Sequence, residues 1–102
     1  MKIYISGKIT GTTDYMERFS KMEKKLTARG YEVINPATKV DDKGKPREWS
    51  WYMRKCIKLL VGCDAIYMLE GWETSDGAAL EHMIAQKLGI KVFYQRKKKV
   101  IP

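Results

Sequence analysis

The sequence contains little histidine and cysteine, and it has no long apolar run. His82 is the only histidine, and Cys56 and Cys63 are the only cysteines. The two cysteines lie seven positions apart on one predicted helix, roughly 10 Å along its axis, which is too far for a disulfide. Because no zinc-site spacing is present either, we expect no metal and no cofactor.

The absence of a long apolar run also bears on location. No stretch approaches the roughly 20 apolar residues that cross a bilayer, so we expect no membrane partner. Residues 1–5 enter a strand pattern at once and show neither the apolar stretch nor the cleavage site of a signal peptide. We therefore expect a cytoplasmic protein.

The overall composition is that of an ordinary globular protein. Apolar residues make up 44% of the 102 residues and charged residues 31%, which predicts a single domain over residues 1–102 with one hydrophobic core. The formal net charge of +8 admits nucleic acid and phosphorylated small molecules as partners. Part of the excess lies in the tail of Arg96, Lys97, Lys98 and Lys99, which also fits a solvated basic terminus.

Hydrophobic periodicity predicts strands that alternate with helices. Strands are expected at residues 2–6, 31–35, 64–69 and 91–94. The first helix is expected to follow a capping box of Asp14 and Glu17 and to end at Gly30. Two further helices are expected at residues 49–60 and 78–88, and the polar stretch 37–48 is expected to be a loop.

This alternation predicts a three-layer α/β fold of the flavodoxin or Rossmann-like kind. Right-handed crossovers give a four-stranded parallel sheet, and helices on both faces favour the strand order 2-1-3-4. The first and third strands are then neighbours, and a ligand site is expected between their carboxyl ends. The loops at that point are residues 7–11 and 70–77.

The first of these loops is suited to an anion. Gly7 and Gly11 allow close approach of a ligand to the backbone, Lys8 supplies a positive charge, and a helix begins a few residues later. The spacing is not that of a P-loop, which excludes that class of NTPase. A tight turn without a ligand is the alternative reading of the two glycines.

The second loop leads to Glu81, near the start of the third predicted helix. Its position borders Ala78 and Ala85, away from the apolar stripe of that helix. The helix dipole favours an ionised carboxylate there, and a carboxylate held against a sugar can attack an anomeric carbon. The alternative is a charge on a solvated helix face.

Several neighbouring residues have two readings each. Ser75 and Asp76 suit either an N-cap or, for Ser75, a hydrogen bond to a phosphate or hydroxyl. Trp72 could stack on a base or pack against the protein, and Asp64 could simply close the turn before the third strand.

Taken together, these motifs resemble the nucleoside 2-deoxyribosyltransferase-like superfamily, and most closely its short phage and bacterial members of unassigned function. The resemblance covers nearly the whole chain. It is carried by Tyr4-Ile5-Ser6-Gly7 with Thr10-Gly11, Asn35-Pro36-Ala37, Trp51-Tyr52-Met53-Arg54, Cys63-Asp64-Ala65-Ile66-Tyr67-Met68-Leu69, and Gly71-Trp72-Glu73-x-Ser75-x-Gly77-Ala78-x-Leu80-Glu81.

The resemblance implies cleavage of an N-glycosidic bond, by hydrolysis or transfer. Glu81 matches the nucleophile that attacks C1′, and Tyr4 matches the aromatic residue that positions it. Ser75 matches the residue that contacts a 5′-phosphate in the nucleotide-hydrolysing branch, so a nucleoside 5′-monophosphate is the expected substrate. The expected substrate-binding residues are Gly7, Lys8, Thr10, Gly11, Asp64, Trp72, Ser75, Asp76 and Gly77.

The sequence departs from the family pattern at Cys56. Catalytic members carry an Asp at this position, eight residues before the Asp that opens the third strand. A cysteine is a weak donor and is usually neutral near pH 7. A nucleotide-binding protein of impaired activity is therefore the alternative function, with Asp76 or Glu73 as candidate substitutes for the missing acid.

The resemblance also implies a homodimer or a larger homo-oligomer. In such an assembly, residues 96–99 could contact the phosphate across an interface. A basic nucleic-acid-binding protein is the least favoured reading, because the sequence shows no recognition helix and no strand platform of aromatic and basic residues. Nucleic acid is therefore not an expected partner.

Overall fold

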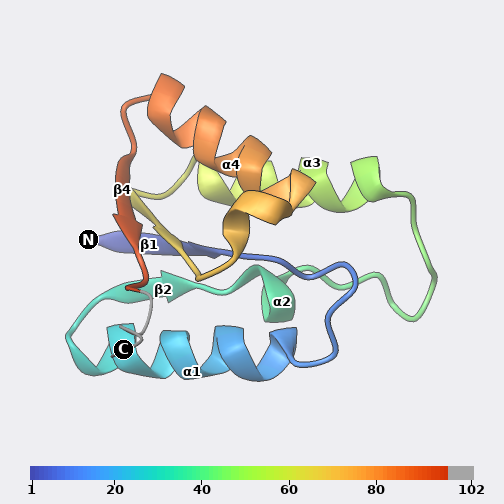
Figure 1. Ribbon diagram of the computed structural model, residues 1–102, viewed down its shortest axis with the longest axis horizontal. Coiled ribbons are helices and arrows are strands. Elements are labelled where there is room, and N and C mark those ends of the chain that lie inside the picture. The colour runs from blue at the N-terminus through green and yellow to red at the C-terminus, as the bar shows by residue number, and fades with distance from the viewer. Residues whose placement is uncertain (97–102) are drawn as a thin grey trace, which may run out of the picture.

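A computed structural model of the chain, in which residues 1–96 are described, has a sheet with helices on both sides (Figure 1). The elements follow one another as β1 (Lys2–Ser6), α1 (Tyr15–Ala28), β2 (Glu32–Ile34), α2 (Pro36–Lys39), α3 (Trp49–Leu60), β3 (Ala65–Met68), the 3-10 helix η1 (Trp72–Thr74), α4 (Asp76–Lys87) and β4 (Lys91–Tyr94).

The sheet has four parallel strands in the order β2-β1-β3-β4, which confirms the predicted fold and strand order. Tyr4 of β1 pairs with Ile34 of β2 on one side and with Ile66 of β3 on the other. The two central strands are thus flanked by neighbours along their length. Their carboxyl ends meet at one edge of the sheet, where a parallel α/β fold builds its ligand sites.

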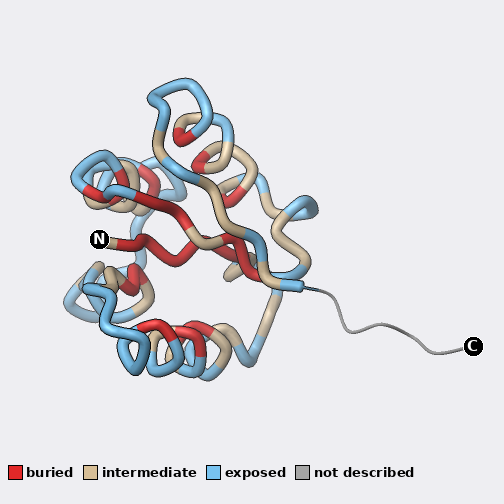
Figure 2. The backbone as a smooth tube through the Cα atoms, turned by 90° about the vertical axis from the view of Figure 1, so that its left-hand side faces the viewer, coloured by how far each residue is buried: buried red, intermediate tan, exposed pale blue. Residues whose placement is uncertain are grey.

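The alternation of side chains along β1 divides the core into two layers. Ile3 and Ile5 point toward α1, where they join a cluster that includes Phe19. Tyr4 points to the opposite face and joins the side chains of α3 and α4. Figure 2 shows the buried residues concentrated along the central strands and on the inner faces of the helices. This period of two directs Tyr4 and Ser6 toward α4.

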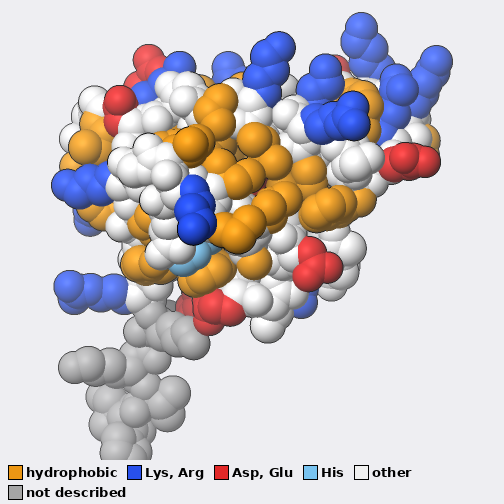
Figure 3. All heavy atoms as spheres, turned by 90° about the horizontal axis from the view of Figure 1, so that it is seen from above, with side chains coloured by type: hydrophobic (Ala, Val, Ile, Leu, Met, Phe, Trp, Pro, Cys, Tyr) orange, Lys and Arg blue, Asp and Glu red, His pale blue; other side chains and the backbone are white. Residues whose placement is uncertain are grey.

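Apolar side chains are exposed on α4 and just after the ends of α3 and α4. Met83 and Leu88 are 49% and 60% exposed, and Val61 is 51% exposed at the end of α3. Figure 3 shows hydrophobic side chains running across this face, with Lys and Arg side chains gathered at its upper right edge.

The predicted loop over residues 37–48 is wrong at its start, where α2 forms. The buried side chain of Asn35 accepts a hydrogen bond from the backbone N–H of Ala37 at 3.0 Å, and Pro36 occupies the first helical position. An N-cap of this kind followed by proline is sufficient to start a short helix. Asn35 also donates to Glu23 at 3.0 Å, which ties this turn to α1.

The predicted capping box at the start of α1 is also wrong. Asp14 precedes the helix, but its side chain makes no cap hydrogen bond. Instead its carboxylate accepts a hydrogen bond from the Nε of Arg18 at 3.1 Å. The pairing of residues four apart on the helix has taken the place of the cap.

The third long helix, α4, begins two residues earlier than predicted, at Asp76. Ser75 is its N-cap, because the Ser75 hydroxyl oxygen accepts a hydrogen bond from the backbone N–H of Ala78 at 3.2 Å. Glu81 therefore lies in the second turn of α4. The buried positions of this helix are Ala78, Glu81 and Ala85.

Candidate active site

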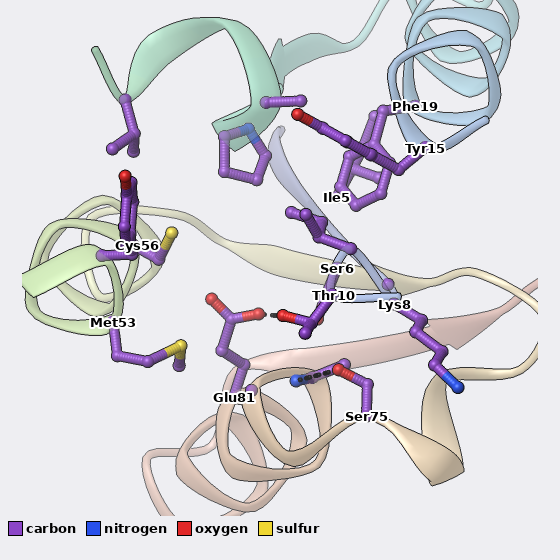
Figure 4. Close-up of a pocket in the computed structure, with 18 of the residues that line it drawn as sticks. Ile5, Ser6, Lys8, Thr10, Tyr15, Phe19, Met53, Cys56, Ser75 and Glu81 are labelled. Carbon is purple, nitrogen blue, oxygen red and sulfur yellow. Dashed lines mark hydrogen bonds between the residues drawn. The ribbon is translucent and has the colours of Figure 1, made fainter. Parts of the chain in front are cut away.

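A cavity of about 670 Å³ opens at the carboxyl ends of β1 and β2 (Figure 4). Its walls come from the loop after β1, the start of α4, α2 and α3, with two side chains of α1. This volume falls within the range of small-molecule sites. The cavity brings together eight of the residues expected from the sequence: Tyr4, Gly7, Lys8, Thr10, Ser75, Asp76, Gly77 and Glu81.

The centre of the site is the carboxylate of Glu81, which is only 5% exposed. The hydroxyl of Ser6 donates to its Oε1 at 2.8 Å, and the hydroxyl of Tyr4 donates to its Oε2. Both donors come from the same face of β1, and the carboxylate comes from the buried face of α4. The reading of Glu81 as a charge on a solvated helix face is therefore wrong.

Burial controls the protonation of Glu81. Removal from water raises the pKa of its carboxyl to about 7, against the two hydrogen bonds from Tyr4 and Ser6, which lower it. The expectation that the helix dipole favours an ionised carboxylate did not include this burial, which favours the protonated form. Near neutral pH the group is divided between an ionised, nucleophilic form and a protonated form, as is common for catalytic carboxyls.

Tyr4 is held in its protonated form. Burial first, and then the neighbouring charge of Glu81, raise the pKa of this phenol well above its usual value of 10.0. A phenol that keeps its proton can only donate to the carboxylate opposite it. Tyr4 therefore fixes the direction of Glu81 and favours its ionised form.

Cys56 also lines the cavity, from the inner face of α3. Burial and the charge of Glu81 raise the pKa of its thiol to about 11. The thiol is therefore neutral at pH 7 and is neither a nucleophile nor an effective acid. Figure 4 shows Cys56 and Met53 on one side of Glu81, with Ser75 and Lys8 on the other.

The side of the cavity near Lys8 is suited to an anion. The Lys8 ammonium lies 3.4 Å from the hydroxyl oxygen of Thr74. The Ser75 hydroxyl accepts the N–H of Ala78, so its own proton is left to donate to a ligand. The positive end of the α4 dipole points to the same place.

The side of the cavity near Cys56 is built from apolar and aromatic groups. Met53, Trp49 and Tyr52 of α3 line it, with residues 40–42 after α2. The hydroxyl of Tyr52 donates to Asp42 at 2.6 Å. This hydrogen bond is the main cause that lowers the pKa of the Asp42 carboxyl. The contact fastens the loop after α2 to α3 across the mouth of the cavity.

Two glycines of the site serve close packing. A Cβ at Gly7 would lie 3.0 Å from the side chain of Leu69, and a Cβ at Gly77 would lie 3.0 Å from the sulfur of Met53. The absence of a side chain therefore lets α3 approach α4 and lets the first loop lie against the end of β3.

Three of the expected site residues do not line the cavity. Asp64 lies at the opposite end of β3, where its carboxylate accepts the backbone N–H of Lys2 at 2.8 Å. Trp72 stacks on His82, with the ring centroids 4.2 Å apart. Gly11 lies in the first loop but outside the cavity wall. Of the basic tail, Lys97, Lys98 and Lys99 lie outside the described residues.

The sequence reasoning missed Ser6 as a site residue. The signal was available, because Ser6 follows Tyr4 by two positions on a strand and so shares its face. It also missed the wall that α2 and α3 contribute. These residues are distant from the two loops in sequence, and only the fold brings them together: Pro36, Ala37, Val40, Asp41, Asp42, Trp49, Tyr52 and Met53.

Within residues 1–96, no three His, Cys, Asp or Glu side chains gather as they would around a metal ion. Within the same residues, none of the helices combines the length and apolar character required to span a membrane.

Comparison with known proteins agrees with this architecture. The family profile described as a domain of unknown function, DUF4406, matches residues 1–94, and the chain belongs to this family. No curated protein matches the sequence. A solved 2-deoxyribosyltransferase from the psychrotolerant bacterium Bacillus psychrosaccharolyticus, described as a suitable biocatalyst for the synthesis of antiviral and antitumoral nucleosides, has a similar structure.

The similarity to this enzyme has a TM-score of 0.73 at 18% sequence identity and covers 100% of this chain and 77% of the other. At this identity the comparison establishes a shared fold. The resemblance to the nucleoside 2-deoxyribosyltransferase-like superfamily, expected from the motifs, is thereby confirmed at the level of the fold.

The raised pKa of Glu81 predicts a pH dependence of stability. The carboxyl takes up a proton more readily in the folded protein, with a pKa of about 7, than at its ordinary value of 4.5. The folded state therefore loses relative stability as the pH rises from 4.5 to 7. Glu81→Gln removes this effect. As the pH rises from acid values to pH 8, the free energy of unfolding of this variant should therefore increase by about 3 kcal/mol relative to that of the unsubstituted protein.

Urea denaturation at a series of pH values measures this difference. Glu17→Gln, which changes an exposed glutamate of α1, is the matched control. Parallel pH profiles for Glu81→Gln and the unsubstituted protein would contradict the assignment.

Proposed function

We propose that this protein cleaves the N-glycosidic bond of a ribo- or deoxyribonucleoside 5′-monophosphate, with Glu81 as the nucleophile. The observation that carries the proposal is a buried carboxylate, fixed by Tyr4 and Ser6, at the side of a cavity of nucleotide-binding size. The fold shared with a 2-deoxyribosyltransferase supports a nucleoside-related glycosyl reaction.

The reaction proceeds in two displacements. The ionised carboxylate of Glu81 attacks C1′ of the sugar, an ester bond forms, and the bond from C1′ to the base breaks with its electron pair going to the base nitrogen. A proton from solvent or a neighbouring acid neutralises the departing base. Water then attacks C1′, or a second base does so, and the Glu81 carboxylate is released unchanged.

The order of chemical groups in the cavity supports a nucleotide. Lys8 and Ser75 lie on one side of Glu81 and suit the phosphate, while Met53 and Cys56 lie on the other side and suit a planar base (Figure 4). The sugar between them would then lie against the carboxylate. A free nucleoside would leave Lys8 and the positive end of α4 without an anion.

Binding of nucleotides without turnover is the second candidate, and Cys56 is the observation that favours it. Base departure is faster when an acid protonates the base. A thiol with a pKa of about 11 supplies no such proton at neutral pH. Asp76 lines the cavity and is exposed, which makes it the candidate substitute for the missing acid.

Release of free base from a panel of nucleoside monophosphates tests the reaction. Chromatography should detect the base with the unsubstituted protein, and Glu81→Ala should lower the rate by at least about 1,000-fold, because the nucleophile is lost. Glu17→Ala, which changes an exposed glutamate of α1 outside the cavity, is the matched control. Equal release by Glu81→Ala and the unsubstituted protein would reject Glu81 as the nucleophile. Tight binding without any release would favour the second candidate.

The pH profile of the reaction should follow the ionisation of Glu81. The rate should fall below pH 7, because the protonated carboxyl is not a nucleophile. Tyr4→Phe removes a donor that lowers the pKa of Glu81, so its profile should shift to higher pH. Initial rates between about pH 5 and pH 9 measure the shift. A midpoint that moves to lower pH, or that does not move, would contradict this role of Tyr4.

We further propose that the chain acts as a homodimer or larger homo-oligomer. The exposed apolar side chains of Met83, Leu88 and Val61 on the α3 and α4 face support this (Figure 3). Light scattering should give at least twice the mass of one chain. The double substitution Met83→Lys with Leu88→Lys should reduce the measured mass to that of a single chain. A single-chain mass for the unsubstituted protein at all concentrations would exclude the assembly.

A further inference from the structure

The outer face of α3, together with the loop that precedes it, has the composition of a polyanion-binding surface. We infer that it binds single-stranded nucleic acid. This surface, called here the basic face, consists of Arg47, Trp51, Arg54, Lys55 and Lys58. The inference does not depend on the glycosidic reaction proposed above.

The positive charge of the described chain is concentrated in this region. Residues 39–58 contain seven Lys and Arg against three Asp and Glu. The other described residues, 1–38 and 59–96, contain ten against nine and are nearly balanced. Nearly all of the net positive charge of residues 1–96 therefore comes from residues 39–58. Charge that served only to solvate the surface would not need to be concentrated in one segment.

The spacing along α3 places these charges in one stripe. Trp51, Arg54, Lys55 and Lys58 follow one another at i, i+3, i+4 and i+7, and the three cations are exposed. The opposite stripe, which includes Met53 and Leu60, is buried in the core. The stripe extends for about 10 Å along the helix axis.

The cations of the stripe have no carboxylate partner within residues 1–96. The ion pairs formed there join Lys2 to Glu32 and Arg18 to Asp14, far from this face in the sequence. Arg54, Lys55 and Lys58 are thus available to an external anion. Figure 3 shows Lys and Arg side chains gathered at the corresponding edge of the molecule.

An aromatic ring lies among these cations. The guanidinium carbon of Arg47 lies 5.1 Å from the ring centroid of Trp51, and the ammonium of Lys55 lies 5.4 Å from it. Trp51 therefore holds one cation from the loop and one from the helix at the start of the stripe. Trp49, two residues before Trp51, lies on the Met53 side of α3, where it lines the cavity, and it is not part of the basic face.

This combination favours a single strand over other polyanions. Proteins bind single strands by cations along the phosphates and aromatic rings on which unpaired bases stack. A duplex keeps its bases stacked inside and offers none to Trp51, and an inorganic polyanion has no base. The sequence shows no such platform on strands; the aromatic ring and the cations lie instead on a helix and a loop.

Fluorescence anisotropy with a labelled single-stranded oligonucleotide of about 12 nucleotides tests the inference. Four phosphate contacts predict that the affinity falls about 50-fold between roughly 50 and 200 mM salt. Lys55→Gln with Lys58→Gln should weaken binding and reduce this salt effect to about sevenfold. Trp51→Ala should weaken binding about fivefold or more without changing the salt effect, because stacking is not ionic.

Two control variants locate the surface. Lys21→Gln with Lys24→Gln removes two exposed lysines at the same spacing on α1. Lys97→Gln, Lys98→Gln and Lys99→Gln neutralise the basic tail. Both variants should bind the oligonucleotide with the same salt dependence as the unsubstituted protein. Thermal melting confirms that each variant is folded. Loss of binding in either control that equals the loss in the α3 variant would overturn the inference.

Competing ligands decide the class of partner. The labelled strand should be displaced more readily by an unlabelled single strand than by a duplex of the same sequence or by inorganic polyphosphate at equal phosphate concentration. Equal displacement by polyphosphate, or binding to phosphatidylserine vesicles in the absence of oligonucleotide binding, would overturn the assignment to nucleic acid. Because none of these measurements requires turnover, they stand or fall independently of Glu81.

Discussion

The site depends on one buried interaction, the carboxylate of Glu81 held between the hydroxyls of Tyr4 and Ser6. Burial makes the charged form of Glu81 unfavourable, and the two donors restore part of its stability. The strand supplies both donors from one face, so β1 and α4 must keep their relative position for the carboxylate to be satisfied. A group whose pKa lies near 7 for this reason can serve as a nucleophile at neutral pH, at the expense of folding stability.

The sequence was sufficient to predict the architecture, because apolar residues recur with different periods in the strands and in the helices. The apolar run that became β3 and the amphipathic pattern that became α3 predicted a parallel sheet, and the order 2-1-3-4 followed from packing rules. The errors fall at element ends, where single hydrogen bonds decide the outcome. Asn35 starts a short helix that composition alone reads as loop, and Arg18 removes Asp14 from its expected cap.

The site was predictable only in part. Topology indicated the two loops, and the resemblance indicated Glu81, Tyr4 and Ser75. The wall formed by α2 and α3 arises from residues distant in sequence, which no local pattern connects. Asp64 belongs to one of the family motifs and was expected in the site. It lies instead at the end of β3 away from the cavity, where its carboxylate accepts a hydrogen bond from the backbone of Lys2. The protonation of Glu81 also required the structure, because burial and the hydrogen bonds from Tyr4 and Ser6 change its pKa in opposite directions and burial is the larger effect.

The central claim is that Glu81 forms a covalent bond to the sugar. Mass spectrometry of the protein after incubation with a 2′-fluoro-2′-deoxynucleoside 5′-monophosphate, in which fluorine slows release of the sugar, tests this most directly. A mass increase of one sugar phosphate is expected, located on the peptide that carries Glu81 and absent in Glu81→Gln. Release of base with the adduct on another residue, or with no adduct at all, would contradict it.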